Sequence, residues 1–258
     1  MLVWIASRSI AVIALIAFAW CYLMAAVIYA AVTWAARRGH EAVLKASSPV
    51  TLTPLAVIFG LFIGFLAADV WPSFERARAA VGQEAMGLRQ ALIVADALPP
   101  EARRLVRAAV REHIITAVGE EWPAMAAGAE SLRSYPRAMA KAVTELLSMN
   151  PAHSGQQLAI EHAVQAMERA LDARRQRILI SQASVGAVRW FVLMVLAGLI
   201  QITIAMVHAG SRRTAVITMF IFATAVAVST LVIITYDRPF GGGGVSVPPT
   251  ALEDVRPD

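Results

Sequence analysis

The chain has 258 residues, of which 58% are hydrophobic and 16% are charged, and its formal net charge is +5. A soluble protein of this composition would expose too much apolar surface, so a soluble globular domain is excluded and lipid is expected to surround about a third of the chain. The single cysteine, Cys21, excludes a disulfide framework and a thiolate metal site.

Four long apolar stretches organise the sequence, two before and two after a charged middle. They are residues 10–34, 52–68, 190–207 and 215–236, and each has between 17 and 25 residues. A helix needs about 20 apolar residues, at about 1.5 Å each, to cross a hydrocarbon core of about 30 Å. The first stretch exceeds the ~7–15 residues of a signal-peptide core, so we expect it to remain as a span. The sequence predicts an all-α membrane protein with four transmembrane helices in a 2+2 arrangement around a central helical domain.

The predicted organisation has four parts. Residues 1–72 hold transmembrane helices 1 and 2, 73–186 form an extramembrane helical domain, 187–240 hold transmembrane helices 3 and 4, and 241–258 form a flexible C-terminal tail. The tail interpretation rests on the glycine run at 241–244, which has no helix signal after it. We expect a multi-pass protein of the bacterial inner membrane.

Basic residues in the two short connections predict the orientation. The first connection carries Arg37, Arg38 and Lys45, and the second carries Arg212 and Arg213. Positive charge in short loops favours the inner side of a membrane, which would place the helical domain and both termini outside.

Phenylalanine and glycine residues mark the second apolar stretch. Gly60 and Gly64 are four residues apart, a spacing that lets two membrane helices pack closely. Phe59, Phe62 and Phe65 cover one broad face, which could form an apolar pore constriction if several copies surrounded an axis. Ordinary core packing or lipid contact is the alternative for these three rings.

Four charged residues lie where spans are expected to meet one interface. Asp69 ends the second span, Arg189 begins the third, and Asp237 and Arg238 follow the fourth. Charges at the hydrocarbon edge are costly unless they pair, so we predict an interface charge cluster of these four side chains. The cluster is either a structural clamp or an ion-binding vestibule.

The helical domain shows a helical apolar pattern throughout. Pro99-Pro100, Glu121-Trp122-Pro123 and Asn150-Pro151 are predicted to break it into separate helices. Residues 73–186 contain 14 Lys/Arg and 12 Asp/Glu. Because these charges nearly balance and lack a basic, aromatic-interleaved stripe, nucleic-acid binding is not expected.

Glu84 lies on the apolar stripe of the helix that continues from the second span. A carboxylate there would lose its hydration unless a cation met it. Glu84 lies about as far beyond the second span as Arg174 lies before the third, at a height of about 22 Å. We therefore predict a Glu84–Arg174 or a Glu84–Arg177 salt bridge, with Glu121, Trp122 and Pro123 close to it. The alternative is a solvated Glu84.

The sequence contains no recognisable catalytic motif. The five histidines lack metal-ligand spacing, and neither a nucleophile elbow nor a phosphate-binding glycine loop occurs. The spans contain no central carboxylate or histidine of the kind that relays protons. We expect no catalytic residue, no metal and no cofactor, and we do not expect an enzyme.

Several short motifs resemble the bestrophin-like domain family over residues 50–250. The motifs are Asp69-x-Trp71 after a span with Pro54, Gly60 and Gly64, Glu84-Ala85 with Leu88, Leu98-Pro99, Glu121-Trp122-Pro123, Arg174-Arg175-x-Arg177 and Asp237-Arg238-Pro239-Phe240. The resemblance implies a relation to bestrophins, which are pentameric anion channels with two spans, a large cytosolic helical domain and two more spans. The sequence differs from bestrophins in lacking an acidic calcium-clasp run and a Pro- and Phe-rich neck motif.

Two functions are compatible with these features. The first is an oligomeric channel permeable to small anions, which requires a homo-oligomer with a pore on its symmetry axis. The second is a non-catalytic membrane scaffold or sensor whose helical domain binds a partner or ligand. Oligomer mass and ion flux distinguish the two.

Overall fold

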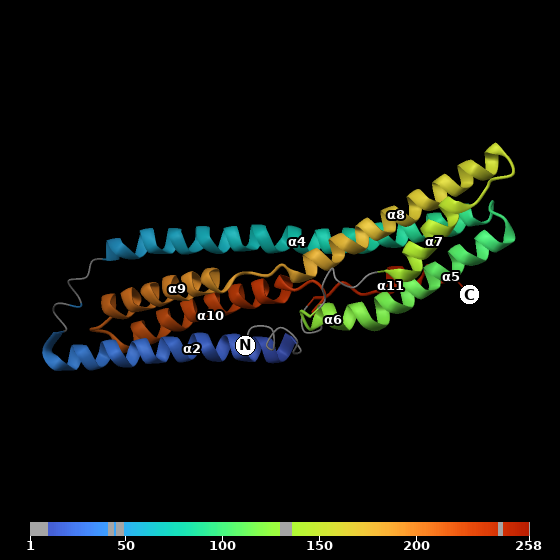
Figure 1. The fold of residues 1–258 in the computed structure, drawn as a ribbon. Coiled ribbons are helices and arrows are strands. Elements are labelled where there is room, and N and C mark those ends of the chain that lie inside the picture. The colour runs from blue at the N-terminus through green and yellow to red at the C-terminus, as the bar shows by residue number, and fades with distance from the viewer. Residues whose placement is uncertain (1–9, 41–43, 45–48, 130–135, 242–244, 258) are drawn as a thin grey trace. The chain divides into compact units, whose positions relative to one another are not determined.

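The computed structural model describes residues 10–40, 44, 49–129, 136–241 and 245–257. The regular structure in these ranges is helical, without a strand, as Figure 1 shows. The elements are α2 (Ile10–Ala35), η1 (Ala36–His40), η2 (Pro49–Thr51), α4 (Leu52–Ala95), α5 (Pro100–Thr116), η3 (Ala117–Glu121), α6 (Trp122–Ala126), α7 (Arg137–Ser148), α8 (Ser154–Gln182), α9 (Ala187–Val207), α10 (Arg212–Asp237) and α11 (Thr250–Glu253). The predicted all-α class is confirmed.

The chain divides into two compact units. The apolar unit consists of Met1–Pro72 and Ser184–Asp237, and the polar unit consists of Ser73–Ala183 and Arg238–Asp258. Within the described residues, four helical segments are long and apolar enough to cross a membrane: Ile10–Gly39, α4, α9 and α10. The protein is therefore an integral membrane protein of the all-α class. The 2+2 arrangement in the bilayer stays a prediction.

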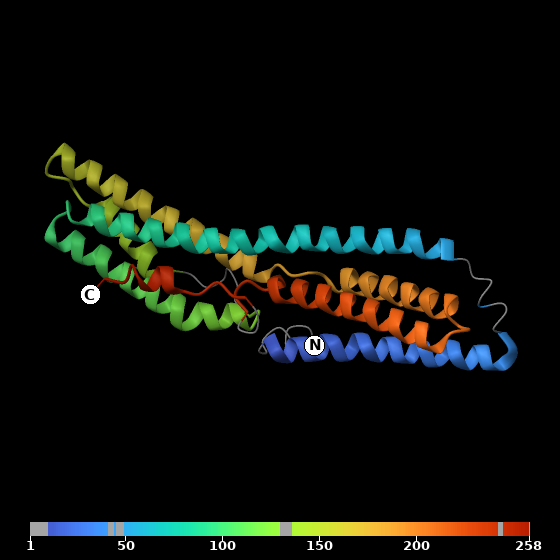
Figure 2. The same cartoon turned by 180° about the vertical axis from the view of Figure 1, so that it is seen from behind.

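In the apolar unit, α2 and α10 lie side by side, and α9 packs with them (Figures 1 and 2). Their shared core contains Cys21, Leu193, Ala223 and Val226, all with 0% exposed area. Cys21 and Ala223 are small, which lets the helix backbones approach closely at these two positions. Cys21 is a packing residue in this core.

The polar unit has a separate core of aliphatic and methionine side chains. Its members include Leu88, Val110, Met139 and Met167, which are fully buried. The predicted breaks at Pro99-Pro100 and Asn150-Pro151 coincide with the gaps between helices. The predicted break at Glu121-Trp122-Pro123 is wrong, because the backbone stays in the right-handed helical region from Thr116 to Trp122. The π-helical turn η3 leads directly into α6, where Pro123 occupies a first-turn position that needs no N–H.

The C-terminal segment differs from the flexible tail that the glycine run suggested. Val247, Leu252 and Val255 are buried in the core of the polar unit together with Phe240. The Val247 N–H donates to the Pro239 carbonyl oxygen at 2.7 Å. Apolar residues beyond the glycines therefore fold residues 245–257 onto the polar unit, with α11 as a short helix within them.

Candidate functional site

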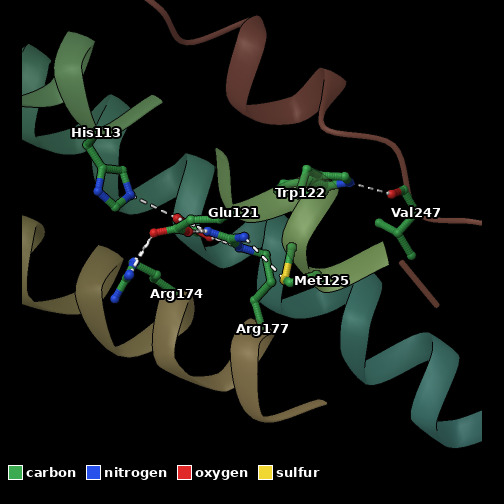
Figure 3. A network of polar contacts seen from close by, with 8 residues as sticks. His113, Glu121, Trp122, Met125, Arg174, Arg177 and Val247 are labelled. Atoms are coloured by element: carbon green, nitrogen blue, oxygen red, sulfur yellow. Dashed lines mark hydrogen bonds and ion pairs between the residues drawn. The ribbon is translucent and has the colours of Figure 1, made fainter. Parts of the chain in front are cut away.

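Five ionisable side chains meet inside the polar unit and form what we call the buried charge network. They are Glu84 from α4, His113 from α5, Glu121 from η3, and Arg174 and Arg177 from α8, and none is more than 5% exposed. Figure 3 shows that the arginines of α8 and the His113 ring point toward Glu121 and its neighbourhood. Buried charges are rare unless they are paired, so the network is the most distinctive polar feature of this unit.

Arg177 and Glu84 form the centre of the network. The Arg177 Nε–H donates to Glu84 Oε2 at 2.7 Å, and its Nη2 donates to Glu84 Oε1 at 3.1 Å. This two-bond geometry matches the planar guanidinium to the carboxylate. Both side chains have 0% exposed area. The salt bridge predicted between Glu84 and one of the two arginines is confirmed for Arg177.

Glu121 links the two arginines. Its Oε2 accepts from Arg177 Nη2 at 2.7 Å, and its Oε1 accepts from Arg174 Nε at 2.7 Å. Arg174 Nη2 lies 2.6 Å from the same Oε1. Two carboxylates and two guanidinium groups thus compensate each other, which burial of such charges requires.

His113 completes the network from the opposite side. Its Nε2 lies 2.9 Å from Glu84 Oε1. An ionised carboxylate can only accept hydrogen bonds, so Nε2 carries the hydrogen in this contact. With this bond, both oxygens of Glu84 and both oxygens of Glu121 have protein donors. The two carboxylates are therefore poorly available as general bases or metal ligands.

The surroundings of Glu84 shift its protonation. Burial raises the pKa of Glu84. The Arg177 charge and the hydrogen bonds from His113 and Arg177 together lower this pKa by more than burial raises it, so the pKa of Glu84 lies below the ordinary value. Burial likewise lowers the pKa of Arg177, while Glu84 and Glu121 raise it, and the net pKa lies above the ordinary value. The central pair therefore stays charged at neutral pH.

Trp122 and Met125 of α6 cover the Arg177 guanidinium. The guanidinium carbon lies 4.7 Å from the Trp122 ring centroid, and Nη1 lies 3.5 Å from the Met125 sulfur. The indole N–H donates to the Val247 carbonyl oxygen at 3.3 Å, a bond drawn in Figure 3. Phe240 meets the Trp122 ring edge-on, with centroids 5.5 Å apart. The network, α6 and the C-terminal segment thus share Trp122, which lies near the salt bridge as predicted.

A cavity of about 200 Å³ lies beside the network. Its lining includes His113 and Glu121 of the network, and Glu112, Glu120 and Arg137 around them. This polar cavity gives small polar molecules a place next to two network members. No cluster of three potential metal ligands occurs in the part of the chain that the structure describes.

The predicted interface charge cluster is brought together in part. Arg189 Nη1 forms an ion pair with Asp69 Oδ2, and both side chains are about half exposed, at 52% each. Asp237 Oδ1 instead accepts from the Val185 backbone N–H at 2.7 Å. Arg238 belongs to the polar unit, where its Nη1 lies next to Gly128. A four-residue cluster stays a prediction, while the Asp69–Arg189 pair is present.

The three phenylalanines do not share one face of α4. Phe59 is buried and packs on Phe222 of α10, with ring centroids 5.5 Å apart. Phe62 is half-buried against the same core, while Phe65 is 65% exposed. Phe59 therefore fits the alternative of core packing. Gly60 and Gly64 border open space, with no described atom of the chain within 4 Å of an added Cβ.

Comparison with known proteins agrees with this architecture. The family described as "Bestrophin-like domain" matches residues 16–252. The chain belongs to the bestrophin-like domain family. Among curated proteins, none matches the sequence significantly.

Solved structures show the same fold as this bestrophin-like chain. A bacterial bestrophin homologue from Klebsiella pneumoniae, carrying a point mutation, has a TM-score of 0.69 and 12% identity, with 94% of this chain and 96% of that chain covered. Another structure of the homologue from that organism has a TM-score of 0.66 and 15% identity, covering 94% and 95%. A structure described as a mutated membrane protein has a TM-score of 0.69 and 13% identity, covering 94% and 96%. At such identities the likeness establishes the fold.

Sequence reasoning on this bestrophin-like chain missed two members of the site, His113 and Met125. His113 lacks metal-ligand spacing, and no motif in the sequence singles it out. A helical count would have indicated its burial, because Val106, Ala109 and Val110 lie seven, four and three residues before it and are all buried. Met125 carries no sequence signal beyond its position three residues after Trp122.

Proposed function

We propose that this bestrophin-like protein is the subunit of an oligomeric channel permeable to small anions. It is a multi-pass protein of the bacterial inner membrane with its short connections on the inner side. The observation that carries the proposal is an exposed apolar face of α4 in the apolar unit. Family membership and the shared fold support it, because the resemblance to bestrophins implies anion conduction through an oligomer.

The first part of α4 has two opposite faces. One packs inward through Phe59, Leu66 and Val70, which are buried. The other carries Val57, Leu61 and Phe65, which are 63%, 58% and 65% exposed. At 3.6 residues per turn, these three positions and Gly64 fall within an arc of about 100°.

A stripe of this kind suits a symmetric pore. No described residue of the chain covers it, and Gly64 leaves room for close approach between copies. If several copies place Phe65 around an axis, the rings form an apolar constriction that gates by dewetting. The proposed constriction therefore centres on Phe65, because Phe59 points into the core and Phe62 is half-buried.

Flux measurements with purified protein in liposomes test the proposal. We expect wild-type protein to pass chloride or iodide, and Phe65→Ala to change the flux. Phe191→Ala is the matched control, because Phe191 is an equally exposed phenylalanine, at 69%, on another span helix, α9. A monomeric mass in detergent, or anion flux absent from wild-type protein under all voltages, would exclude the channel.

A sensor or scaffold is the second candidate. The observation that favours it is the polar cavity beside the buried charge network, which reaches His113 and Glu121. A ligand there would act on a site that the channel proposal does not require. Glu120→Gln and Arg137→Gln would then alter ligand or partner binding while flux is unchanged or absent.

A further inference from the structure

Two cavities of opposite character adjoin each other in the apolar unit. The first, of about 240 Å³, is lined by residues from α2, η1, α9, the turn after α9, and α10, among them Thr33, Arg37, His208 and Arg212. The second, of about 300 Å³, lies between α2 and α10. Tyr29 lines both cavities, and Ala215 of the first and Val216 of the second are neighbours in the sequence, so the two cavities lie next to each other beside α2 and α10.

The first cavity is basic. Arg37 and Arg212 form no ion pair with any residue that the structure describes, although both line it. The Tyr29 hydroxyl has no hydrogen-bond partner among these residues either. These groups lie at the end of α2 and the beginning of α10, which border the short connections. Basic pockets at such helix ends are suited to phosphate groups of lipids.

The second cavity is almost purely apolar. Ala25, Ala26, Val216, Met219 and Phe220 line it. Tyr22 closes it with its ring stacked on Phe220 at 5.1 Å, and the Tyr22 hydroxyl is bonded to Thr224 Oγ1 at 3.0 Å. The small residues Ala25 and Ala26 leave a groove that a hydrocarbon chain can fill.

We infer that these two neighbouring cavities together bind one anionic phospholipid. The phosphate lies between Arg37 and Arg212, with the Tyr29 hydroxyl as a further donor, and one acyl chain lies in the groove beyond Tyr29. A free phosphate would use only the basic cavity, and a lipid without a phosphate only the apolar one. An anionic phospholipid differs from both because it occupies the two cavities at once. This inference does not depend on ion conduction.

Lipid binding to the delipidated full-length protein tests the inference by native mass spectrometry in detergent. The probes are palmitoyl-oleoyl phosphatidylglycerol and the diacylglycerol with the same chains, which has no phosphate. We expect the wild-type protein to prefer phosphatidylglycerol, and Arg37→Gln with Arg212→Gln to weaken that binding about 30-fold. Arg213→Gln is the matched control, because Arg213 neighbours Arg212 but does not line the cavity.

The groove is tested separately by filling it. Ala26→Trp and Val216→Trp place a large ring in the apolar cavity and should weaken phosphatidylglycerol binding, whereas Val27→Trp, at an exposed position outside the lining, should not. Both fillers replace exposed residues, so folding should be retained, and the melting temperature verifies this. If inorganic phosphate displaced the lipid and neither filler mattered, the site would be a free-anion site and the inference would be wrong. Equal effects of Arg213→Gln and the double variant would overturn it as well.

Discussion

Gly87 of α4 and Ala170 of α8 lie in near backbone contact. A Cβ atom added to Gly87 would be 2.9 Å from the Ala170 nitrogen and 3.0 Å from the Ala166 carbonyl oxygen. Glu84 lies one turn before Gly87, and Arg174 lies one turn after Ala170. The close approach of the two helices therefore brings the carboxylate of α4 within reach of the guanidinium groups of α8.

Gly87→Ala should destabilise the polar unit by about 1–3 kcal/mol, because the added methyl group meets backbone that cannot move aside alone. The measurement is the midpoint of denaturant unfolding in detergent. Gly82→Ala is the matched control on the same helix, since an added Cβ there meets nothing within 4 Å. Helix propensity predicts that Gly82→Ala is stabilising by up to about 1 kcal/mol. Equal effects of the two substitutions would contradict the close approach.

Replacing one partner of the Glu84–Arg177 pair should lower the free energy of unfolding by about 3–5 kcal/mol. Either Glu84→Gln or Arg177→Met leaves the remaining network with an uncompensated buried charge. The double variant should lose less than the sum of the two single losses. The exposed pair Arg175–Asp172 is the control, with side chains 67% and 71% exposed. Its removal should cost about 0–1 kcal/mol. A coupling energy below about 0.5 kcal/mol for Glu84 and Arg177 would count against the pair.

The folded protein should lose stability at acid pH because Glu84 becomes protonated. Its pKa in the folded state lies below the ordinary value of 4.5, so the carboxylate's stabilising contribution is complete above about pH 4.5 and is lost as pH falls through the lower, folded value. Arg177 adds nothing to this acid dependence, because its raised pKa moves its titration further into the alkaline range. The melting temperature should fall with pH more steeply for wild-type protein than for Glu84→Gln. Parallel profiles would contradict the assignment to Glu84.

The Glu84–Arg177 contact could be predicted because Glu84 lies on the apolar stripe of its helix, where a carboxylate requires a cation. Counting residues from the spans pointed to the arginines of α8, although α8 does not continue into α9: residues 183–186 between them are not helical. The role of Glu121 as a bridge could not be obtained in this way, because its position depends on the π-helical turn η3. The sequence suggested a helix break there, and the structure shows an uninterrupted helical backbone.

The position of the phenylalanines illustrates a second limit. A spacing of three residues rotates a side chain by about 300° per step, so Phe59 and Phe65 differ by about 120° around the helix. Which of the two rings faces the core depends on the partner helix. Phe59 faces the core because its ring packs on Phe222 of α10. Apolar composition alone does not distinguish a core face from an exposed face in a membrane helix.

Leu252→Ala should destabilise the polar unit by about 2–5 kcal/mol, because Leu252 is fully buried in its core. Val245→Ala in the same segment is the control and should have little effect, since Val245 is 37% exposed. Denaturant midpoints again give the difference. If Leu252→Ala behaved like its control, the segment would be unattached in solution.

The Asp69–Arg189 ion pair should contribute little to the free energy of unfolding. Both side chains are half exposed, so Asp69→Ala should cost only about 0–1 kcal/mol. Asp237→Ala should cost more, about 1–3 kcal/mol, because it leaves the part-buried Val185 N–H without its acceptor. Melting temperatures of the two variants give the ranking. The reverse order would indicate that the charge cluster, rather than the backbone contact, holds these residues.

The C-terminal segment also determines when the polar unit can finish folding. Phe240, Val247, Leu252 and Val255 share its core with Val106 and Met167, yet they follow α9 and α10 in the sequence. At about 5–20 residues per second, a ribosome that has completed Ala183 needs roughly 4–14 s to reach Val255. Throughout that interval the nascent chain carries an incomplete core while two more apolar helices, α9 and α10, are being synthesised. The polar unit can therefore complete its core only after both of these helices have been made.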